Sequence, residues 1–303
     1  MKKISAAFVL GLISLCSFAQ KAPEKSLLWK VSGNGISKPS YLFGTIHMLC
    51  KDDAALSDSM KLIIREAEEV YFEVDLDNMM EMMGMLKEMK MKGDTTLRDL
   101  LSAADYTLVK EYFVKHSAML PFSQLETYKP ILAAAVIQQG SLKCGSTAME
   151  QEIMTEAKQY RKKISGLETM GYQASVLDQI PYKAQAEQLL GFIKEETRAK
   201  SDTEATATDT EFREMMDAYR EQDLDKLESL IKKSDIGMDS YADVLLYKRN
   251  YNWIEKLKQL LPAKRLLVAV GAGHLPGDKG VINLLRKAGF TVTPVVNTST
   301  KTI

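Results

Sequence analysis

The stretch YLFGTIHML, residues 41–49, is an apolar run of strand-forming residues that ends in a glycine, two further residues and a histidine. A second stretch, RLLVAVGAGHL at residues 265–275, repeats this pattern near the other end of the chain. The histidines in these positions, His47 and His274, are two of only three in the sequence. We interpret the stretches as the ends of two buried strands whose histidines share one site.

Strand patterns gather at both ends of the chain, and helical spacing dominates between them. Further apolar or β-branched runs occur at residues 26–33, 70–77, 163–169 and 291–296. This arrangement predicts a single α/β domain over residues 20–303. Its central β-sheet is completed by N- and C-terminal strands, and a large helical middle section occupies about 78–160 and 171–262.

Residues 1–19 have the layout of a cleavable signal peptide, with a basic start, an apolar run and a small-x-small ending before Gln20. Lipidation at Cys16 is the less favoured alternative because the preceding Leu15 is bulky. We therefore expect a periplasmic or secreted protein. No other apolar stretch is long enough to cross a bilayer, so no transmembrane segment is expected in the mature chain.

Two cysteines, Cys50 and Cys144, remain after removal of the predicted signal peptide. In an oxidising compartment such a pair forms a disulfide, although two unrelated thiols are the alternative. Cys50 follows the first histidine motif, so we predict a disulfide that holds the edge of the site.

Charge excludes one class of partner. The chain has 40 basic and 40 acidic residues, hence no formal net charge, and shows no basic stripe of the kind that nucleic-acid binding requires. We expect a peptide or small-molecule substrate instead. Neither the substrate nor the oligomeric state follows from composition.

Two glutamates also stand where strand patterns end, Glu73 in VYFEVD and Glu168 in ISGLET. Sites in open α/β sheets collect beyond the carboxyl ends of the strands, where His47 and His274 are also expected. Two imidazoles and two carboxylates suit a divalent cation such as zinc, manganese, cobalt or iron. The alternative for each residue is an ordinary hydrogen-bonded or solvated side chain.

Three motif glycines, Gly44, Gly271 and Gly273, fit such a site because they permit unusual dihedrals and close approach of the backbone. The third histidine, His116, lies on a helical pattern without this context, and we interpret it as structural or exposed. The methionine-rich run 79–91 has lysines and glutamates interleaved at helical spacing. It predicts an adaptable amphipathic helix, packed on the body or lining a cleft, rather than a soft-metal site.

The stretch LLYKRNYNW, residues 245–253, contains an arginine and an asparagine suited to a hydrolytic site. Arg249 could hold a carboxylate or stabilise an oxyanion, and Asn250 could orient a neighbouring group. Arg249 and Trp253 are one helical turn apart. An amphipathic helix whose arginine pairs with an acid is the alternative.

The motifs YLFGTIHM, VYFEVD, GLET, YKRN and VAVGAGHLPGDKGVINLLRKAGFTV together resemble the TraB/GumN family, which includes the TIKI group of Wnt-processing proteases. The resemblance spans about residues 29–296. It implies a fold like that of the erythromycin-esterase and ChaN group, and divalent-metal dependence as in TIKI-type members.

The resemblance also carries roles to individual residues. It implies that His47 and His274 are the paired motif histidines, that Glu73 and Glu168 are site acids, and that Arg249 and Asn250 form the family's Arg-Asn pair. The sequence departs from the pattern at Gly145-Ser146-Thr147, where relatives often have Gly-Val-Asp. Thr147 therefore stands where an acid was expected.

These observations lead to a hypothesis of an exported metal-dependent hydrolase, a peptidase in which one glutamate acts as general base and Arg249 stabilises negative charge. A metal-independent esterase-like hydrolase, in which a histidine and a glutamate activate water, is one alternative. A non-enzymatic haem- or iron-binding protein like ChaN is the other.

Overall fold

The computed structural model describes residues 25–116, 121–141, 144–202, 207–233 and 238–297. Its strands are β1 (Leu28–Ser32), β2 (Ser40–Thr45), β3 (Leu49–Cys50), β4 (Glu69–Phe72), β5 (Ser146–Thr147), β6 (Lys163–Gly166), β7 (Leu266–Gly271) and β8 (Thr291–Pro294). The predicted signal peptide, with Cys16, lies outside the described residues.

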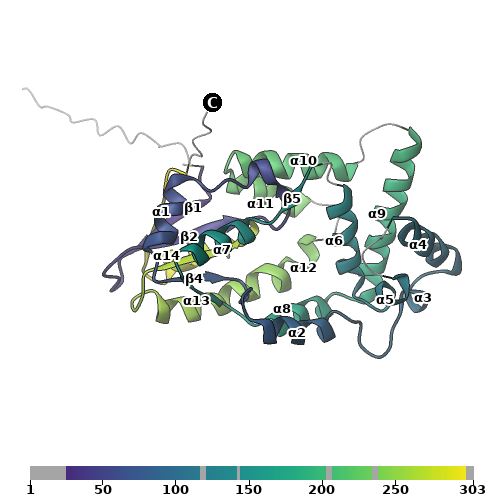
Figure 1. Cartoon of the computed structure of the whole chain (residues 1–303), viewed down its shortest axis with the longest axis horizontal. Coiled ribbons are helices and arrows are strands. Elements are labelled where there is room, and N and C mark those ends of the chain that lie inside the picture. The colour runs from purple at the N-terminus through teal and green to yellow at the C-terminus, as the bar shows by residue number, and fades with distance from the viewer. Residues whose placement is uncertain (1–24, 117–120, 142–143, 203–206, 234–237, 298–303) are drawn as a thin grey trace, which may run out of the picture.

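The helices fall into two groups by position (Figure 1). Those that pack about the sheet are α1 (Asp58–Glu66), α7 (Met149–Gln159), α10 (Ala207–Arg220), α11 (Leu224–Lys233), α13 (Lys248–Leu260) and α14 (Val281–Lys287). The others are α2 (Met79–Glu88), α3 (Leu97–Leu100), α4 (Ala103–His116), α5 (Phe122–Leu125), α6 (Pro130–Ser141), α8 (Met170–Val176), α9 (Tyr182–Asp202) and α12 (Met238–Ala242). Four short turns complete the set: η1 (Lys51–Asp53), η2 (Leu177–Gln179), the π-helical η3 (Asp243–Tyr247) and η4 (Ala272–His274).

The central sheet has six strands in the order β6-β4-β7-β2-β1-β8. β6, β4, β7 and β2 run parallel, whereas β1 is antiparallel to both β2 and β8. The sheet is therefore completed by strands from both ends of the chain around a helical middle, which confirms the predicted α/β fold. Because the four parallel strands are neighbours, their carboxyl ends share one edge.

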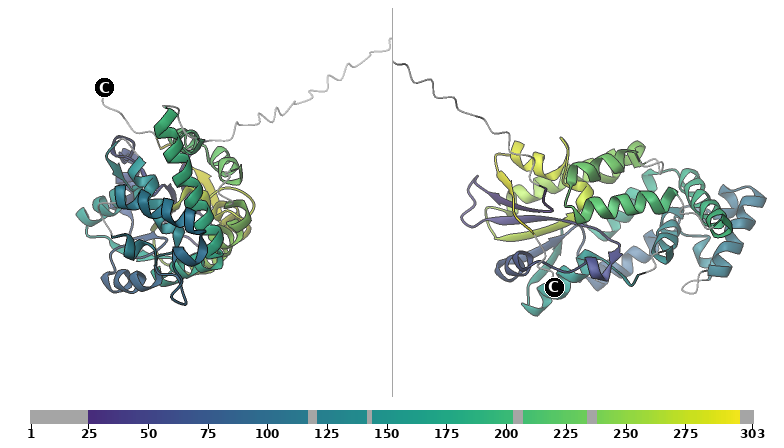
Figure 2. Two further views of the ribbon diagram at one scale, coloured as in Figure 1. Left: turned by 90° about the vertical axis from the view of Figure 1, so that its right-hand side faces the viewer. Right: turned by 90° about the horizontal axis from the view of Figure 1, so that it is seen from above.

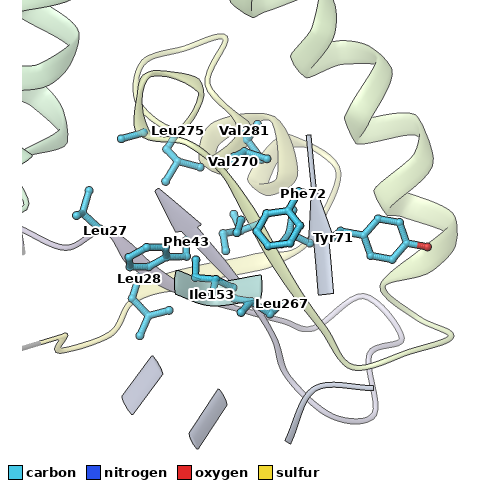
Figure 3. Close-up of a cluster of buried hydrophobic side chains, with 14 of the residues drawn as sticks. Leu27, Leu28, Phe43, Tyr71, Phe72, Ile153, Leu267, Val270, Leu275 and Val281 are labelled. Carbon is cyan, nitrogen blue, oxygen red and sulfur yellow. The ribbon is translucent and has the colours of Figure 1, made fainter. Parts of the chain in front are cut away.

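Burial explains why these runs become central strands. β7 is buried along five of its six residues, and all four residues of β4 are buried, as expected for parallel strands covered on both faces. Helices α1 and α7 lie on one face, and α13 and α14 on the other (Figure 2). Side chains from strands and helices form the core between them, among them Phe43, Phe72, Ile153, Val270 and Val281 (Figure 3).

A second core lies at the end of the molecule away from the sheet (Figure 1). It is built by α3, α4, α5, α6 and α9 from residues such as Leu97, Val109, Phe113, Leu189 and Ile193. No helix among the described residues is long and apolar enough to cross a membrane.

The structure contains the disulfide expected from the sequence, between Cys50 and Cys144. β3 pairs antiparallel with β5 beside it, with Cys50 opposite Ser146. The backbone N–H of Met149, at the start of α7, donates to the carbonyl of Ile46. The loop that carries His47 is therefore held against the start of α7 by a disulfide, a short ladder and a further hydrogen bond.

Candidate functional site

The four residues predicted as metal ligands all lie just beyond the carboxyl ends of the parallel strands. His47 follows β2, Glu73 follows β4, Glu168 follows β6, and His274 ends the turn η4 after β7. The strand pattern that includes Glu73 is longer than the strand itself, since β4 ends at Phe72. Glu73, Glu168 and His274 have buried side chains, whereas that of His47 is 70% exposed.

Gly271, at the end of β7, is the point on which three of these side chains converge. A Cβ atom added to Gly271 would lie 3.1 Å from Glu73 Oε1, 3.6 Å from His274 Cδ2 and 4.0 Å from His47 Nε2. Any side chain here would fill the space between the two imidazoles and the carboxylate. Close approach therefore requires glycine at this position.

Space is also limited at the other two motif glycines. A Cβ on Gly44 would lie 3.0 Å from Leu275 Cδ1, and one on Gly273 would lie 2.8 Å from Ile231 Cδ1. None of the three glycines has a positive φ, so the expectation of unusual dihedrals at these positions is wrong. Their role is to let neighbouring groups approach.

Arg249 joins the two glutamates. Its Nη2 donates to Glu73 Oε2 at 2.5 Å and to Glu168 Oε1 at 2.6 Å, and its Nε donates to the same Glu168 oxygen at 2.9 Å. Nη1 donates to the carbonyl of Leu245, in the π-helical turn η3 directly before α13. Such turns are frequent at functional sites. A guanidinium presents enough donors in one plane to hold both carboxylates at once.

Asn250 fixes the tautomer of His274. The Asn250 side-chain Nδ2 donates to the carbonyls of His274 and Lys279, so its Oδ1 faces the imidazole. His274 Nδ1 lies 2.6 Å from that oxygen and must carry the proton. Nε2 is then an acceptor, 3.2 Å from Arg249 Nη1 and 3.6 Å from Glu73 Oε1. The sequence prediction that Asn250 orients a neighbour agrees with this geometry.

Glu150, on the first turn of α7, is a site residue that the sequence prediction missed. Its Oε1 lies 2.7 Å from His47 Nδ1 and also accepts from the Thr45 hydroxyl. His47 Nε2 is left to face Gly271. The acid expected at Thr147 is thus not absent from this segment, because a carboxylate three residues later contacts the histidine. Thr147 itself lies in β5 and donates to Glu152.

Gln173 and Trp253 were also missed as polar contacts of the site. Gln173, on α8, donates to Glu73 Oε2 at 2.9 Å, and Trp253 Nε1 donates to Glu168 Oε2 at 2.9 Å. The Trp253 ring also packs on His274, with centroids 4.4 Å apart. Trp253 could have been found from the sequence, because it lies one helical turn from Arg249. No sequence pattern pointed to Gln173.

The surroundings set the charge of each group. Burial favours the neutral form of Glu73, but the positive charges around it, including Arg249, hold the pKa of this carboxyl at about 2. Burial instead raises the pKa of Glu168 and lowers that of His274 to about 3. The hydrogen bond to Glu150 raises the pKa of His47 to about 9. At neutral pH, Glu73 is therefore a carboxylate and His274 a neutral imidazole.

Metal binding can be tested against this donor set. Among the described residues, no group of three or more His, Cys, Asp or Glu side chains is gathered as a ready metal site. The chemistry of His47, His274 and Glu73 nevertheless fits: each Nδ1 is held by an oxygen, as is usual for metal-bound histidine, and each Nε2 lies near Glu73 Oε1 or Gly271. Glu168 accepts from Arg249 and Trp253, and no contact among the described residues brings it to either imidazole, whereas Glu73 Oε1 lies 3.6 Å from His274 Nε2. A cation held by His274 Nε2 would replace the Arg249 Nη1 donor there.

The remaining histidine takes no part in this cluster. His116 ends α4 and is exposed, with Nδ1 2.8 Å from the Tyr112 carbonyl. The sequence interpretation of His116 as structural or exposed agrees with this position.

A family model described as the TraB/PrgY/gumN family matches residues 27–294. The chain belongs to this family. It is 23% identical to "Metalloprotease TIKI1" of Danio rerio over 88% of this chain and 62% of that protein, and 22% identical to "Metalloprotease TIKI1" of Homo sapiens over 90% and 62%. "Uncharacterized protein YbaP" of Escherichia coli (strain K12) is 24% identical over 81% of this chain and 87% of its own length.

The chain thus spans about three fifths of the length of the TIKI1 proteins that it matches. No solved structure matches the chain significantly. The name of the TIKI relatives gives a metal to those proteins. In this chain, the cluster around Gly271 is where the donor chemistry would suit one.

Proposed function

We propose that the chain is an exported hydrolase of peptide bonds that uses a divalent cation, with manganese, cobalt, zinc and iron as the candidates. The observation that carries the proposal is the gathering of His47, His274 and Glu73 around Gly271, each imidazole with Nδ1 anchored and Nε2 turned inward. The printed name of the TIKI relatives supports the choice of peptide substrates.

His47, His274 and Glu73 would hold the cation. A cation bound there would polarise the scissile carbonyl and lower the pKa of a bound water. Glu150 and Asn250 keep the two imidazoles in the tautomer that presents Nε2. A cation at Nε2 would take the place of the proton that His47 carries below its raised pKa of about 9.

Arg249 and Glu168 have separate roles in this proposal. Glu168 holds the guanidinium through its Nε and Nη2 donors. Arg249 supplies a positive charge beside Glu73 and His274, where it would stabilise the negative charge that develops on the carbonyl oxygen of a peptide under attack. Glu168, raised in pKa by its burial, is the candidate for proton transfer to the leaving amine.

Export is part of the proposal because two observations support it. The sequence of residues 1–19 has the layout of a signal peptide, and the Cys50–Cys144 disulfide is typical of proteins in an oxidising compartment.

Elemental analysis with mutagenesis tests the metal assignment. Purified wild-type protein should contain about one divalent ion, and His47→Ala and His274→Ala should each lose it together with hydrolysis of a mixed peptide library. His116→Ala is the matched control and should retain both. A His47→Ala protein with its full metal content would contradict the assignment.

Two specific observations favour a second candidate function. Arg249 Nη1 already donates to His274 Nε2, and the exposed His47 is paired with Glu150 as in a metal-independent general base. In such a hydrolase, His47 Nε2 would take the proton from water. Activity should then survive exhaustive chelation and rise with pH toward the His47 pKa of about 9, because only the neutral imidazole is a base.

A further inference from the structure

Helix α8 contacts Glu73 through Gln173 and is held at both of its ends by side chains from the helical section of the chain. In Figure 1, α8 lies between the sheet and the helices of the second core. Gln173 donates from its Nε2 to Glu73 Oε2 at 2.9 Å. The contacts at the two ends of α8 therefore decide where this donor stands.

Glu81 holds the start of α8. Its Oε2 accepts from the backbone N–H of Met170, the first residue of the helix, at 2.9 Å. An acid suits this place because the first N–H groups of a helix have no partner within it. Glu81 is a half-buried residue of α2, which packs on α8, whereas Met79 and Met83 on α2 are exposed. The sequence predicted an amphipathic helix here, but not that its apolar face would point away from the body.

Lys129 holds the end of α8. Its Nζ donates to the carbonyl of Ala174, in the last turn of the helix, at 2.7 Å and pairs with Asp178 Oδ1 at 2.9 Å. A cation suits this place because the last carbonyl groups of a helix have no partner within it. Lys129 is fully buried, which is rare for a lysine unless it is paired.

Lys129 also joins α8 to the second core. It directly precedes α6, one of the helices that build this core, and its backbone N–H donates to the carbonyl of Met89, just after α2. Lys92, close by in the sequence, pairs with the other oxygen of Asp178. The position of α8 is thus set by the helical section and not by the sheet alone.

The two oxygens of Glu73 have different partners. Oε1 accepts from the Gly271 N–H at 2.8 Å and lies 3.6 Å from His274 Nε2, so it faces the cluster. Oε2 accepts from Arg249 on α13 and from Gln173 on α8. The last torsion of a glutamate side chain is soft, so a carboxylate whose outer oxygen has one donor can turn. Two donors from different helices fix its plane.

We propose that Gln173 is a positioning residue for Glu73, and that Lys129 acts on Glu73 through α8 and Gln173. Gln173 and Arg249 together hold Oε2, which leaves Oε1 as the oxygen presented to the imidazoles. The consequence for metal rests on the proposed function: if Glu73 is a metal ligand, loss of the Gln173 donor weakens metal binding, because the partners of a ligand orient it. The helical section then tunes the metal affinity of a site built on strand ends.

Nuclear magnetic resonance of the metal-free protein tests the positioning itself. The amide proton of Gly271 reports its hydrogen bond to Glu73 Oε1. Gln173→Met keeps the length of the side chain but removes the donor, and it should shift this resonance. Gln179→Met is the matched control, because Gln179 is exposed in the turn after α8, and it should leave the resonance unchanged. An unshifted Gly271 resonance in Gln173→Met, or an equal shift in the control, overturns the proposal.

A double variant tests the route through α8. Lys129→Met should shift the Gly271 resonance in the same direction as Gln173→Met does. Added to Gln173→Met, it should change the resonance little further, because the donor that Lys129 positions is already gone. If the two shifts add, Lys129 does not act through Gln173 and the proposal fails. If Lys129→Met does not fold, Glu81→Met makes the same test from the other end of α8.

Calorimetric titration with manganese, cobalt, zinc and ferrous iron measures the consequence for the site. Metal affinity should fall roughly 10-fold in Gln173→Met and in Lys129→Met, no further in the double variant, and not at all in Gln179→Met. If the wild type binds none of the four ions while the Gly271 resonance still shifts, the proposed function fails and the positioning role stands. If Gln173→Met binds metal as tightly as the wild type, the positioning role fails and the proposed function stands.

Discussion

Glu69 and Glu73 are buried glutamates at opposite ends of one short strand segment, and both have a pKa held at about 2. Glu69 accepts from Lys163, Lys264 and Ser165, and the lysine side chains are 68% and 41% exposed. Glu73 accepts from Arg249, Gln173 and the Gly271 N–H, and the Arg249 side chain is 8% exposed.

The difference lies in where the partner charges are. If Glu69 is removed, its two lysine side chains can turn into water. The ion pairs of Glu69 therefore link neighbouring strands without leaving a buried charge when they are broken. If Glu73 is removed, Arg249 stays buried with Glu168 as its one carboxylate partner among the described residues, and His274 loses its carboxylate neighbour. A low pKa alone therefore does not distinguish a functional carboxylate from a structural one. The distinguishing feature is that the charged partners of the carboxylate are buried.

The largest expected effect separates the two glutamates by activity. Glu73→Gln should lower the rate of peptide hydrolysis about 10³-fold, because the variant loses the charge that faces both imidazoles. Glu69→Gln is the matched change at the other end of the strand and should keep the rate within about twofold. If both variants lost a comparable share of the rate on the same peptide library, the proposed difference in function between Glu73 and Glu69 would be wrong.

The next effect concerns Arg249, the side chain that bridges Glu73 and Glu168. Arg249→Lys keeps the charge but cannot donate to both glutamates, so the hydrolysis rate should fall about 10²-fold. Lys264→Arg makes the reverse exchange at Glu69, where one donor suffices, and should leave the rate unchanged. Full activity in Arg249→Lys would show that the bridge between the two carboxylates is not required.

Glu150→Gln tests the anchor of the second imidazole. The amide no longer holds His47 by a charge-assisted bond, so metal affinity or hydrolysis should fall roughly 10- to 100-fold. Calorimetric titration with manganese measures this change apart from activity. Glu152→Gln, on the same helix, is the control and should bind manganese as the wild type does; a similar loss there would point to a general effect on α7.

The smallest effect is a stability difference in acid. Burial raises the pKa of Glu69, but hydrogen bonds from Lys163 and Lys264 outweigh it and lower the folded-state pKa from 4.5 to about 2. Its contribution to folding is present above pH 4.5 and is lost as the pH falls toward 2. In Glu69→Gln, denaturant unfolding should therefore cost about 1 kcal/mol less at pH 7, with a smaller drop in acid. If the unfolding free energy of Glu69→Gln fell as steeply in acid as that of the wild type, this role of Glu69 would be contradicted.

Much of this site follows from the sequence because it depends on strand ends. An apolar run that ends in a polar residue locates His47, Glu73, Glu168 and His274 along the chain. Parallel pairing of β6, β4, β7 and β2 then brings the four together. The order of those strands was not predictable, because residues far apart in the chain become neighbours.

Glu150 and Gln173 could not be predicted for a different reason. Acids are ordinary in the first turn of a helix, so Glu150 had no distinguishing pattern. Its role depends on how β3, β5 and the disulfide place α7 against His47. Likewise, helical periodicity located an amphipathic α2, but only packing on α8 decided which face pointed outward.

The pairing of β2 with β7 has a consequence for the order of events during biosynthesis. Residues 41–45 find their neighbours at 267–271, more than two hundred positions later. A nascent chain that has emerged only to Pro262 already contains His47, Glu73, Glu168 and Arg249, yet the strand that separates β2 from β4 is still missing. Long-range pairing of this kind folds slowly. A site built this way stays incomplete until synthesis of the chain is nearly finished.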